Sequence, residues 1–196
     1  MYLYDTEWDN YLLQSVGMTI KTYKIILVGN ASVGKTSLRR IFMGNSFKES
    51  YSMTIGADFS VYRHTDGKTI HIWDLAGELR FQHLIQAYYA GTLGALVVFD
   101  LTNPDSFENI SKWMEDIYTN VNGQKIPIIL VGNKSDLRYD SPTKVTDQEA
   151  HLYANQLSEW LGYEILYINT SAKTGDNVEI IFHALINKIE EYLINN

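Results

Sequence analysis

Residues 29–36 have the types and spacing that are typical of a loop that binds phosphate groups. They read Gly-Asn-Ala-Ser-Val-Gly-Lys-Thr between an apolar run and a helix-forming segment, which fits the pattern G-x-x-x-x-G-K-S/T in its usual context. Glycines let the backbone wrap closely, so that N–H groups and a helix N-terminus face the phosphates. Lys35 is expected to reach the β- and γ-phosphate oxygens, and the Thr36 hydroxyl to bind Mg²⁺. The alternative is a glycine turn that fits by chance, and the rest of the chain argues against it.

A second group of polar residues has the chemistry to recognise a nucleobase. Asp136 follows the third apolar run of the chain, and its carboxylate offers two acceptor oxygens. Two acceptors match the N1–H and N2-amino donors of guanine, and they match nothing on adenine. Asp136 therefore predicts selection of GTP over ATP.

Other residues in the same two loops are expected to complete the base site. Asn133 is expected to tie the loops together, and the stem of Lys134 to lie along one face of the base. The backbone N–H of Ala172, which follows the fourth apolar run, can reach guanine O6. Each of these short segments alone is common in surface turns, but together with the phosphate loop they predict a nucleotide site. The residues expected there are Ala31, Ser32, Val33, Gly34, Lys35, Thr36, Ser37, Asn133, Lys134, Asp136, Ser171, Ala172 and Lys173.

The elements that position these loops alternate between strands and helices. Apolar runs without polar alternation indicate strands that are covered on both faces, and they occupy residues 23–28, 94–99, 126–131 and 165–168. Helical periodicity occupies residues 37–42, 107–118, 147–160 and 178–192. The candidate caps of these helices are Asp105, Thr146 and Asp176. This alternation predicts βαβ units with right-handed crossovers.

One pair of strands breaks the alternation. Residues 59–64 and 69–75 flank Asp66-Gly67, a strong signal for a β-hairpin. We therefore expect an α/β fold of three layers, with a six-stranded, mostly parallel sheet, one antiparallel edge strand and helices on both faces. This domain is expected to span residues 22–196, after an N-terminal extension of residues 1–21.

Composition excludes several classes of protein. The chain has 196 residues and a formal net charge of −7, and no basic cluster is longer than Arg39-Arg40, so it is not expected to bind nucleic acid. It has no cysteine, so it forms no disulfide or thiolate metal site. Its apolar runs are too short to span a membrane. These features predict a cytoplasmic protein of one domain.

With these motifs in place, the chain resembles a Ras-superfamily small GTPase over residues 21–193. Two more segments carry the resemblance: Thr54-Ile55-Gly56 resembles switch I, and Trp73-Asp74-Leu75-Ala76-Gly77 resembles the entry to switch II. The Rab branch is the most similar, on the evidence of Thr54 to Phe59, Arg80-Phe81, Tyr88-Tyr89 and Asp105 to Asn109.

The resemblance implies a P-loop GTPase that binds GTP or GDP with Mg²⁺, hydrolyses GTP slowly and acts as a molecular switch in membrane trafficking or related signalling. It implies that Thr54 and Asp74 join Thr36 at the metal, and that the N–H of Gly77 contacts the γ-phosphate. Phe47 would stack on guanine, and Tyr51 would close over the phosphates. The implied partners are a guanine-nucleotide exchange factor, a GTPase-activating protein and effectors, all of which bind the switch regions. Phe59, Trp73 and an aromatic residue of the pair at 88–89 would form the surface that partners contact.

The sequence departs from the family at the position after Gly77. The family has a glutamine that positions the attacking water, and this chain has Glu78. A carboxylate accepts a hydrogen bond but cannot donate one as an amide does, and it adds negative charge beside the γ-phosphate. The residues expected to act in hydrolysis are Lys35, Gly77 and Glu78. The alternative function is a GTP-holding module whose hydrolysis is negligible.

The two ends of the chain also differ from the Rab pattern. With no cysteine, no prenyl anchor is encoded in this chain, and Tyr2 excludes N-myristoylation. Residues 1–21 are compatible with a short amphipathic helix that packs on the domain or a partner, with membrane contact, or with disorder. Membrane contact is disfavoured because this segment has three acidic residues and no basic residue before Lys21.

Overall fold

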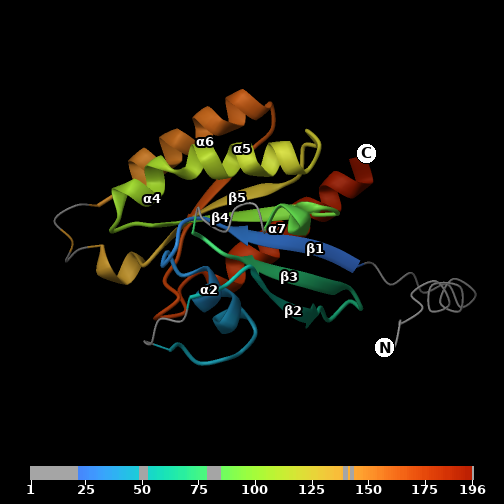
Figure 1. The fold of residues 1–196 in the computed structure, drawn as a ribbon, viewed down its shortest axis with the longest axis horizontal. Helices are drawn as coiled ribbons and strands as arrows, with labels where there is room; N and C mark the ends of the chain where they lie inside the picture. Colours follow the sequence, from blue (N-terminus) through green and yellow to red (C-terminus); the bar gives the residue numbers. More distant parts are fainter. Residues whose placement is uncertain (1–21, 49–52, 79–84, 139–140, 142–143, 196) are drawn as a thin grey trace, which may run out of the picture.

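The computed structural model describes residues 22–48, 53–78, 85–138, 141 and 144–195. A six-stranded sheet lies at its centre, in the order β2-β3-β1-β4-β5-β6 (Figure 1). All neighbouring strands are parallel except β2 and β3, which form the predicted antiparallel pair at the edge. The strands are β1 (Thr22–Val28), β2 (Ala57–Arg63), β3 (Thr69–Leu75), β4 (Gly94–Asp100), β5 (Ile128–Asn133) and β6 (Leu166–Asn169). The predicted fold class is confirmed.

Helices cover both faces of the sheet, and each layer closes its own apolar core (Figure 1). Successive side chains of a strand point to opposite faces, so Ile26 and Val28 of β1 join one core while Ile25 and Leu27 join the other. The first core is covered by α4 (Pro104–Glu108), α5 (Ile110–Asn120) and α6 (Asp147–Leu161). The second is covered by α2 (Lys35–Phe42) and α7 (Val178–Asn195). Short 3₁₀ turns, η2 (Gln86–Tyr89) and η3 (Ser135–Leu137), complete the described elements.

The helix predicted at residues 107–118 is in fact two helices. The first, α4, begins at Pro104, and Asn109 separates it from α5. Proline suits the first helical position because its φ is fixed and its missing N–H has no partner there anyway. The N-cap is therefore Asn103, and the prediction of Asp105 as a cap was wrong: it lies in the first turn of α4.

The cap predicted at Thr146 is confirmed as a capping box. The Thr146 hydroxyl accepts a bond from the N–H of Glu149 at 3.2 Å, and the Glu149 carboxylate accepts one from the N–H of Thr146 at 2.8 Å. These bonds satisfy two donors that a helix start leaves without partners. At the last helix, α7 begins at Val178, two residues after Asp176.

Some predictions fall on residues that the structure does not describe. These are the N-terminal extension at residues 1–21, Tyr51 in the switch I segment, and the Arg80-Phe81 pair. Among the described helices, none combines the length and the apolar character needed to cross a membrane.

Candidate nucleotide-binding site

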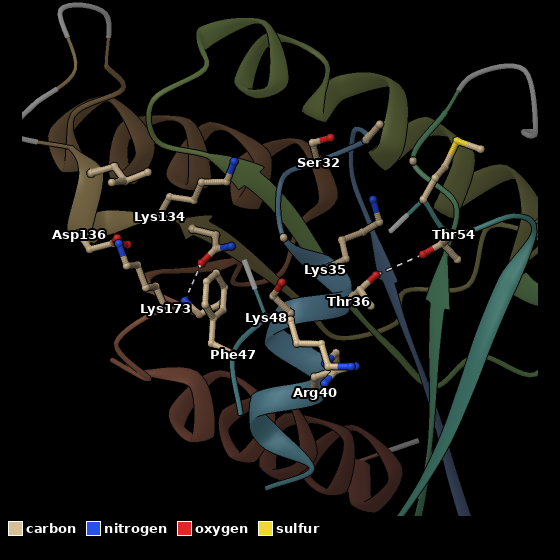
Figure 2. A pocket seen from close by; sticks show the side chains of 18 of the residues that line it. Ser32, Lys35, Thr36, Arg40, Phe47, Lys48, Thr54, Lys134, Asp136 and Lys173 are labelled. Atoms are coloured by element: carbon tan, nitrogen blue, oxygen red, sulfur yellow. Dashed lines mark hydrogen bonds between the residues drawn. The ribbon is translucent and has the colours of Figure 1, made fainter. Parts of the chain in front are cut away.

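A cleft of about 550 Å³ opens at the carboxyl edge of the parallel strands, which is where an open α/β sheet places its ligand. Figure 2 shows Asp136, Lys134 and Lys173 at one end of the cleft and Lys35, Thr36 and Thr54 at the other. The structure thus brings together the predicted phosphate and base residues, which lie far apart in the sequence. The predicted residues that line the cleft are Ala31, Ser32, Gly34, Lys35, Thr36, Ser37, Phe47, Thr54, Gly77, Glu78, Asn133, Lys134, Asp136, Ala172 and Lys173.

Two glycines allow the phosphate loop to adopt its shape. Gly29 has φ of 139° and Gly34 has φ of 101°, in a region that other residues rarely adopt. A Cβ atom at Gly29 would lie 2.0 Å from the carbonyl oxygen of Val98, and one at Gly34 would lie 2.1 Å from the Asn133 amide nitrogen. Both positions therefore require glycine on conformational and steric grounds.

Lys35 lies inside the loop, and its side chain is almost fully buried. Its Nζ donates to the carbonyl oxygens of Gly29 at 2.7 Å and Asn30 at 2.8 Å. Burial lowers the pKa of Lys35 to about 8, and the charge of Asp74 opposes this shift. A cation held in this way is suited to phosphate oxygens, because a bound anion would replace the solvation that burial has removed.

Thr36, Thr54 and Asp74 meet at the phosphate end and form a set of oxygens that suits Mg²⁺. The Thr36 and Thr54 hydroxyl oxygens are 3.2 Å apart, and the Thr36 hydroxyl donates to Asp74 Oδ2 at 2.5 Å. The other oxygen, Asp74 Oδ1, is buried and has no hydrogen-bond partner among the described residues. Burial raises the pKa of Asp74, against the lowering effects of Thr36, Lys35 and Arg39. An unpaired buried carboxylate oxygen beside two hydroxyls fits a hard cation.

Asn133, at the end of β5, links three loops as predicted. Its amide nitrogen donates to the carbonyl of Val33 at 2.8 Å, and its Oδ1 accepts from the Thr170 hydroxyl at 3.3 Å and the Ala172 N–H at 3.1 Å. Val33 therefore contributes a backbone contact behind the cleft rather than a lining side chain. The N–H of Ala172 must be shared with Asn133 if it is also to contact guanine O6, and that contact stays a prediction.

Asp136 and Lys134 are each held by one neighbour. The Ser171 hydroxyl donates to Asp136 Oδ1 at 2.6 Å, so buried Ser171 orients the carboxylate from behind the cleft. The Lys134 Nζ forms an ion pair with Asp100 Oδ2 at 2.6 Å, which draws the lysine stem along the cleft wall. Both arrangements suit the roles that we predict for these side chains at the base.

Gly77 lies against the phosphate loop so closely that no side chain fits. A Cβ atom at this position would lie 2.4 to 2.5 Å from backbone atoms of Asn30 and Ala31. These atoms belong to the peptide group between Asn30 and Ala31, which cannot give way as a flexible side chain would, so glycine is required here. The next residue, Glu78, lines the cleft on the same side.

The cleft also contains residues that the sequence analysis did not select. They are Arg40, Lys48, Met53 and Leu137. Arg40 follows Thr36 by one helical turn, so the spacing of four residues on a helix was a signal that could have identified it. The other three had no motif to mark them.

Trp113 of α5 makes an unpredicted contact with the phosphate loop. Its indole N–H donates to Asn30 Oδ1 at 2.9 Å, across 83 residues of sequence. Asn30 therefore has three neighbours at once, since its carbonyl accepts from Lys35 and its backbone packs against Gly77. Helix α5 and the phosphate loop are joined through this side chain.

Three aromatic residues lie side by side on β2, β3 and η2. The rings of Phe59 and Trp73 are 4.8 Å apart, and those of Trp73 and Tyr88 are 5.1 Å apart. Phe59 remains 42% exposed. The predicted group of aromatic side chains is therefore contiguous, and its role toward partners stays a prediction.

Comparison with known proteins identifies the family of the chain. The Ras family model matches residues 24–191, which is most of the chain. The chain is 37% identical over 179 residues to the Ras-related protein RabC of Dictyostelium discoideum, and this match covers 89% of the chain and 87% of RabC. A match of this extent, over residues that form the cleft and the sheet beneath it, shows that the chain belongs to the Ras family as a Rab-like, GTP-binding small GTPase.

Proposed function

We propose that this GTPase binds GTP and GDP together with Mg²⁺ in the cleft, hydrolyses GTP slowly, and presents its two switch segments to regulators and effectors. The observation that carries the proposal is one cleft in which Asp136 and Lys134 lie at one end and Lys35 and Thr36 at the other (Figure 2). Base recognition and phosphate binding then share one cleft. Similarity to RabC supports a role in membrane trafficking.

The residues of the cleft have distinct tasks in this mechanism. The phosphate-loop N–H groups and Lys35 would neutralise the phosphates, while Thr36, Thr54 and Asp74 would hold Mg²⁺. When bound, Mg²⁺ supplies positive charge that stabilises the phosphate oxygens. The N–H of Gly77 would contact the γ-phosphate, and Phe47 would stack on the base. Because Thr54 and Gly77 lie on different switch segments, loss of the γ-phosphate would release both.

The identity of the nucleotide in purified protein tests the proposal directly. We expect denaturation to release GDP or GTP in a roughly equimolar amount to the protein, together with Mg²⁺. Apo protein should then bind fluorescent GDP and be displaced by GTP but not by ATP. Release of adenine nucleotide, or equal competition by ATP, would contradict the proposal.

Glu78 is expected to place the attacking water but to stabilise the transition state less well than glutamine does. We expect the unmodified protein to hydrolyse GTP no faster than roughly 10⁻⁴ to 10⁻³ s⁻¹, the intrinsic range of Ras. Glu78→Gln restores a donor and should raise the rate severalfold, while Glu78→Leu removes both functions and should lower it about tenfold. Single-turnover hydrolysis at saturating Mg²⁺ measures all three proteins, with nucleotide affinity measured in parallel.

Glu115→Gln, on the exposed side of α5, is the matched control because it removes one carboxylate that does not line the cleft. It should leave hydrolysis unchanged. If Glu78→Leu is as fast as the unmodified protein, Glu78 has no catalytic role. If the unmodified protein shows no hydrolysis at all, the cleft is a GTP-holding module, which is the second candidate that Glu78 favours.

A further inference from the structure

Arg39 is a buried cation on α2, one helical turn after Lys35. Only 6% of this residue is exposed. Its guanidinium donates one bond to the Asp58 carboxylate and another to the Ser60 hydroxyl, both on β2. The planar fork of arginine suits two acceptors on one strand, whereas a lysine would offer a single point charge. Arg39 therefore ties the helix that begins at the phosphate site to the strand that follows switch I.

The tie lies close to the residues that would hold the metal. Asp58 follows Thr54 by four residues, with Gly56 between them at φ of 72°. In the β2–β3 pair, Asp58 stands directly opposite Asp74. Carboxylates that face each other across an antiparallel pair repel, so a cation beside them offsets this cost. Arg39 supplies that cation, and its charge lowers the pKa of Asp74 while that of Asp58 raises it.

Opening of switch I needs Thr54 to move away from Thr36. The part of the chain that moves with Thr54 ends at the first residue of β2 that stays in place. Besides the pairing with β3, which starts at Ala57, Arg39 holds Asp58 and Ser60, so β2 is also attached to α2 from its second residue onward. Without this tie, β2 could unpair from its switch end, and the moving segment would lengthen.

We infer that Arg39 is a positioning residue that slows the release of Mg²⁺ and nucleotide by holding the end of switch I and offsetting the charge of Asp58 beside Asp74. The inference rests on the proposed function, since it concerns the same cleft. It adds a residue outside the cleft lining to the control of nucleotide exchange.

Release of a fluorescent GDP analogue from the full chain tests this inference. In saturating Mg²⁺ we expect Arg39→Met to release nucleotide about fivefold to tenfold faster, because bonds to a charged partner are lost. Arg39→Lys keeps the charge but not the fork, so its rate of nucleotide release should lie between those of the unmodified and Arg39→Met proteins. Asp58→Asn should not speed release further in the Arg39→Met background, because its partner is already absent. Arg63→Met, at the far end of β2, is the control and should release as the unmodified protein does.

Chelation of Mg²⁺ gives a readout that general destabilisation would not change. Once the metal is removed, Thr54 and Asp74 no longer act through it, so the rates of the unmodified and Arg39→Met proteins should differ by less than about twofold. Three results would overturn the inference: unchanged release in Arg39→Met, an acceleration that persists in full under chelation, or effects of the two substitutions that multiply. Thermal unfolding of each variant confirms folding. A protein that takes up no GDP at all would refute the proposed function instead.

Discussion

Replacing Asp136 by asparagine should lower the affinity for GDP and GTP by roughly 10⁴-fold, since buried polar groups are then left mismatched. An asparagine amide presents a donor where guanine also presents donors. Xanthine has a carbonyl oxygen in place of the 2-amino group, so the same substitution should create affinity for xanthine nucleotides. Competition binding with GDP, xanthosine diphosphate and ADP measures this exchange of specificity.

Two further substitutions show whether the effect belongs to base recognition. Asp176→Asn changes an exposed carboxylate in a neighbouring loop and should leave all three affinities unchanged. Ser171→Ala removes the hydroxyl that donates to Asp136 at 2.6 Å and should weaken guanine binding by about tenfold without a gain for xanthine. If Asp136→Asn still prefers guanine, another group recognises the base.

Replacing Lys35 by alanine should weaken nucleotide binding by about 10² to 10³-fold, the range expected when a buried charge loses its partner. Lys35 is the cation that the loop encloses, with its ammonium group on two loop carbonyls. Without it, the phosphates would enter the loop against backbone N–H groups alone. Equilibrium titration of apo protein with fluorescent GDP at fixed Mg²⁺ measures the loss.

The control for Lys35 separates the effect of a charge inside the phosphate loop from the effect of the net charge of the protein. Lys112→Ala removes a lysine whose Nζ bonds only to Asn109 among the described residues, on the exposed side of α5, and should bind GDP normally. Lys35→Met keeps the side-chain volume but removes the charge. It should lose affinity for GDP as Lys35→Ala does, which would show that the charge of Lys35 matters and not its volume. A Lys35→Ala protein that is folded by circular dichroism and binds GDP with full affinity would contradict the phosphate site.

The sheet and the cleft could be predicted because their signals are local. Apolar runs such as residues 94–99 are strands in the structure, because a short run of uniformly apolar residues suits a strand that is buried on both faces. The tie by Asn133 was also predictable, since the end of a parallel strand must meet the other strand ends at one edge. The position of the phosphate loop follows in the same way from its place between β1 and α2.

What the sequence could not predict depends on distant partners. Nothing near Arg39 in the sequence marks it as a partner of Asp58, because their contact depends on how α2 packs against the hairpin. The break at Asn109 was missed because the apolar period continues across it. The use of the Ala172 N–H by Asn133 also depends on loop geometry, which residue types do not encode.

Because Trp113 bonds to the phosphate loop, its intrinsic fluorescence can report on that loop. Indole emission shifts to longer wavelength as water reaches the ring, and Trp113 is only 3% exposed. Of the other tryptophans that the structure describes, Trp160 is 63% exposed and Trp73 is half-buried, so their emission lies further to the red. Among the tryptophans that the structure describes, the blue edge of the emission therefore belongs mainly to the indole bonded to Asn30, which makes it a reporter of the phosphate loop without any added dye.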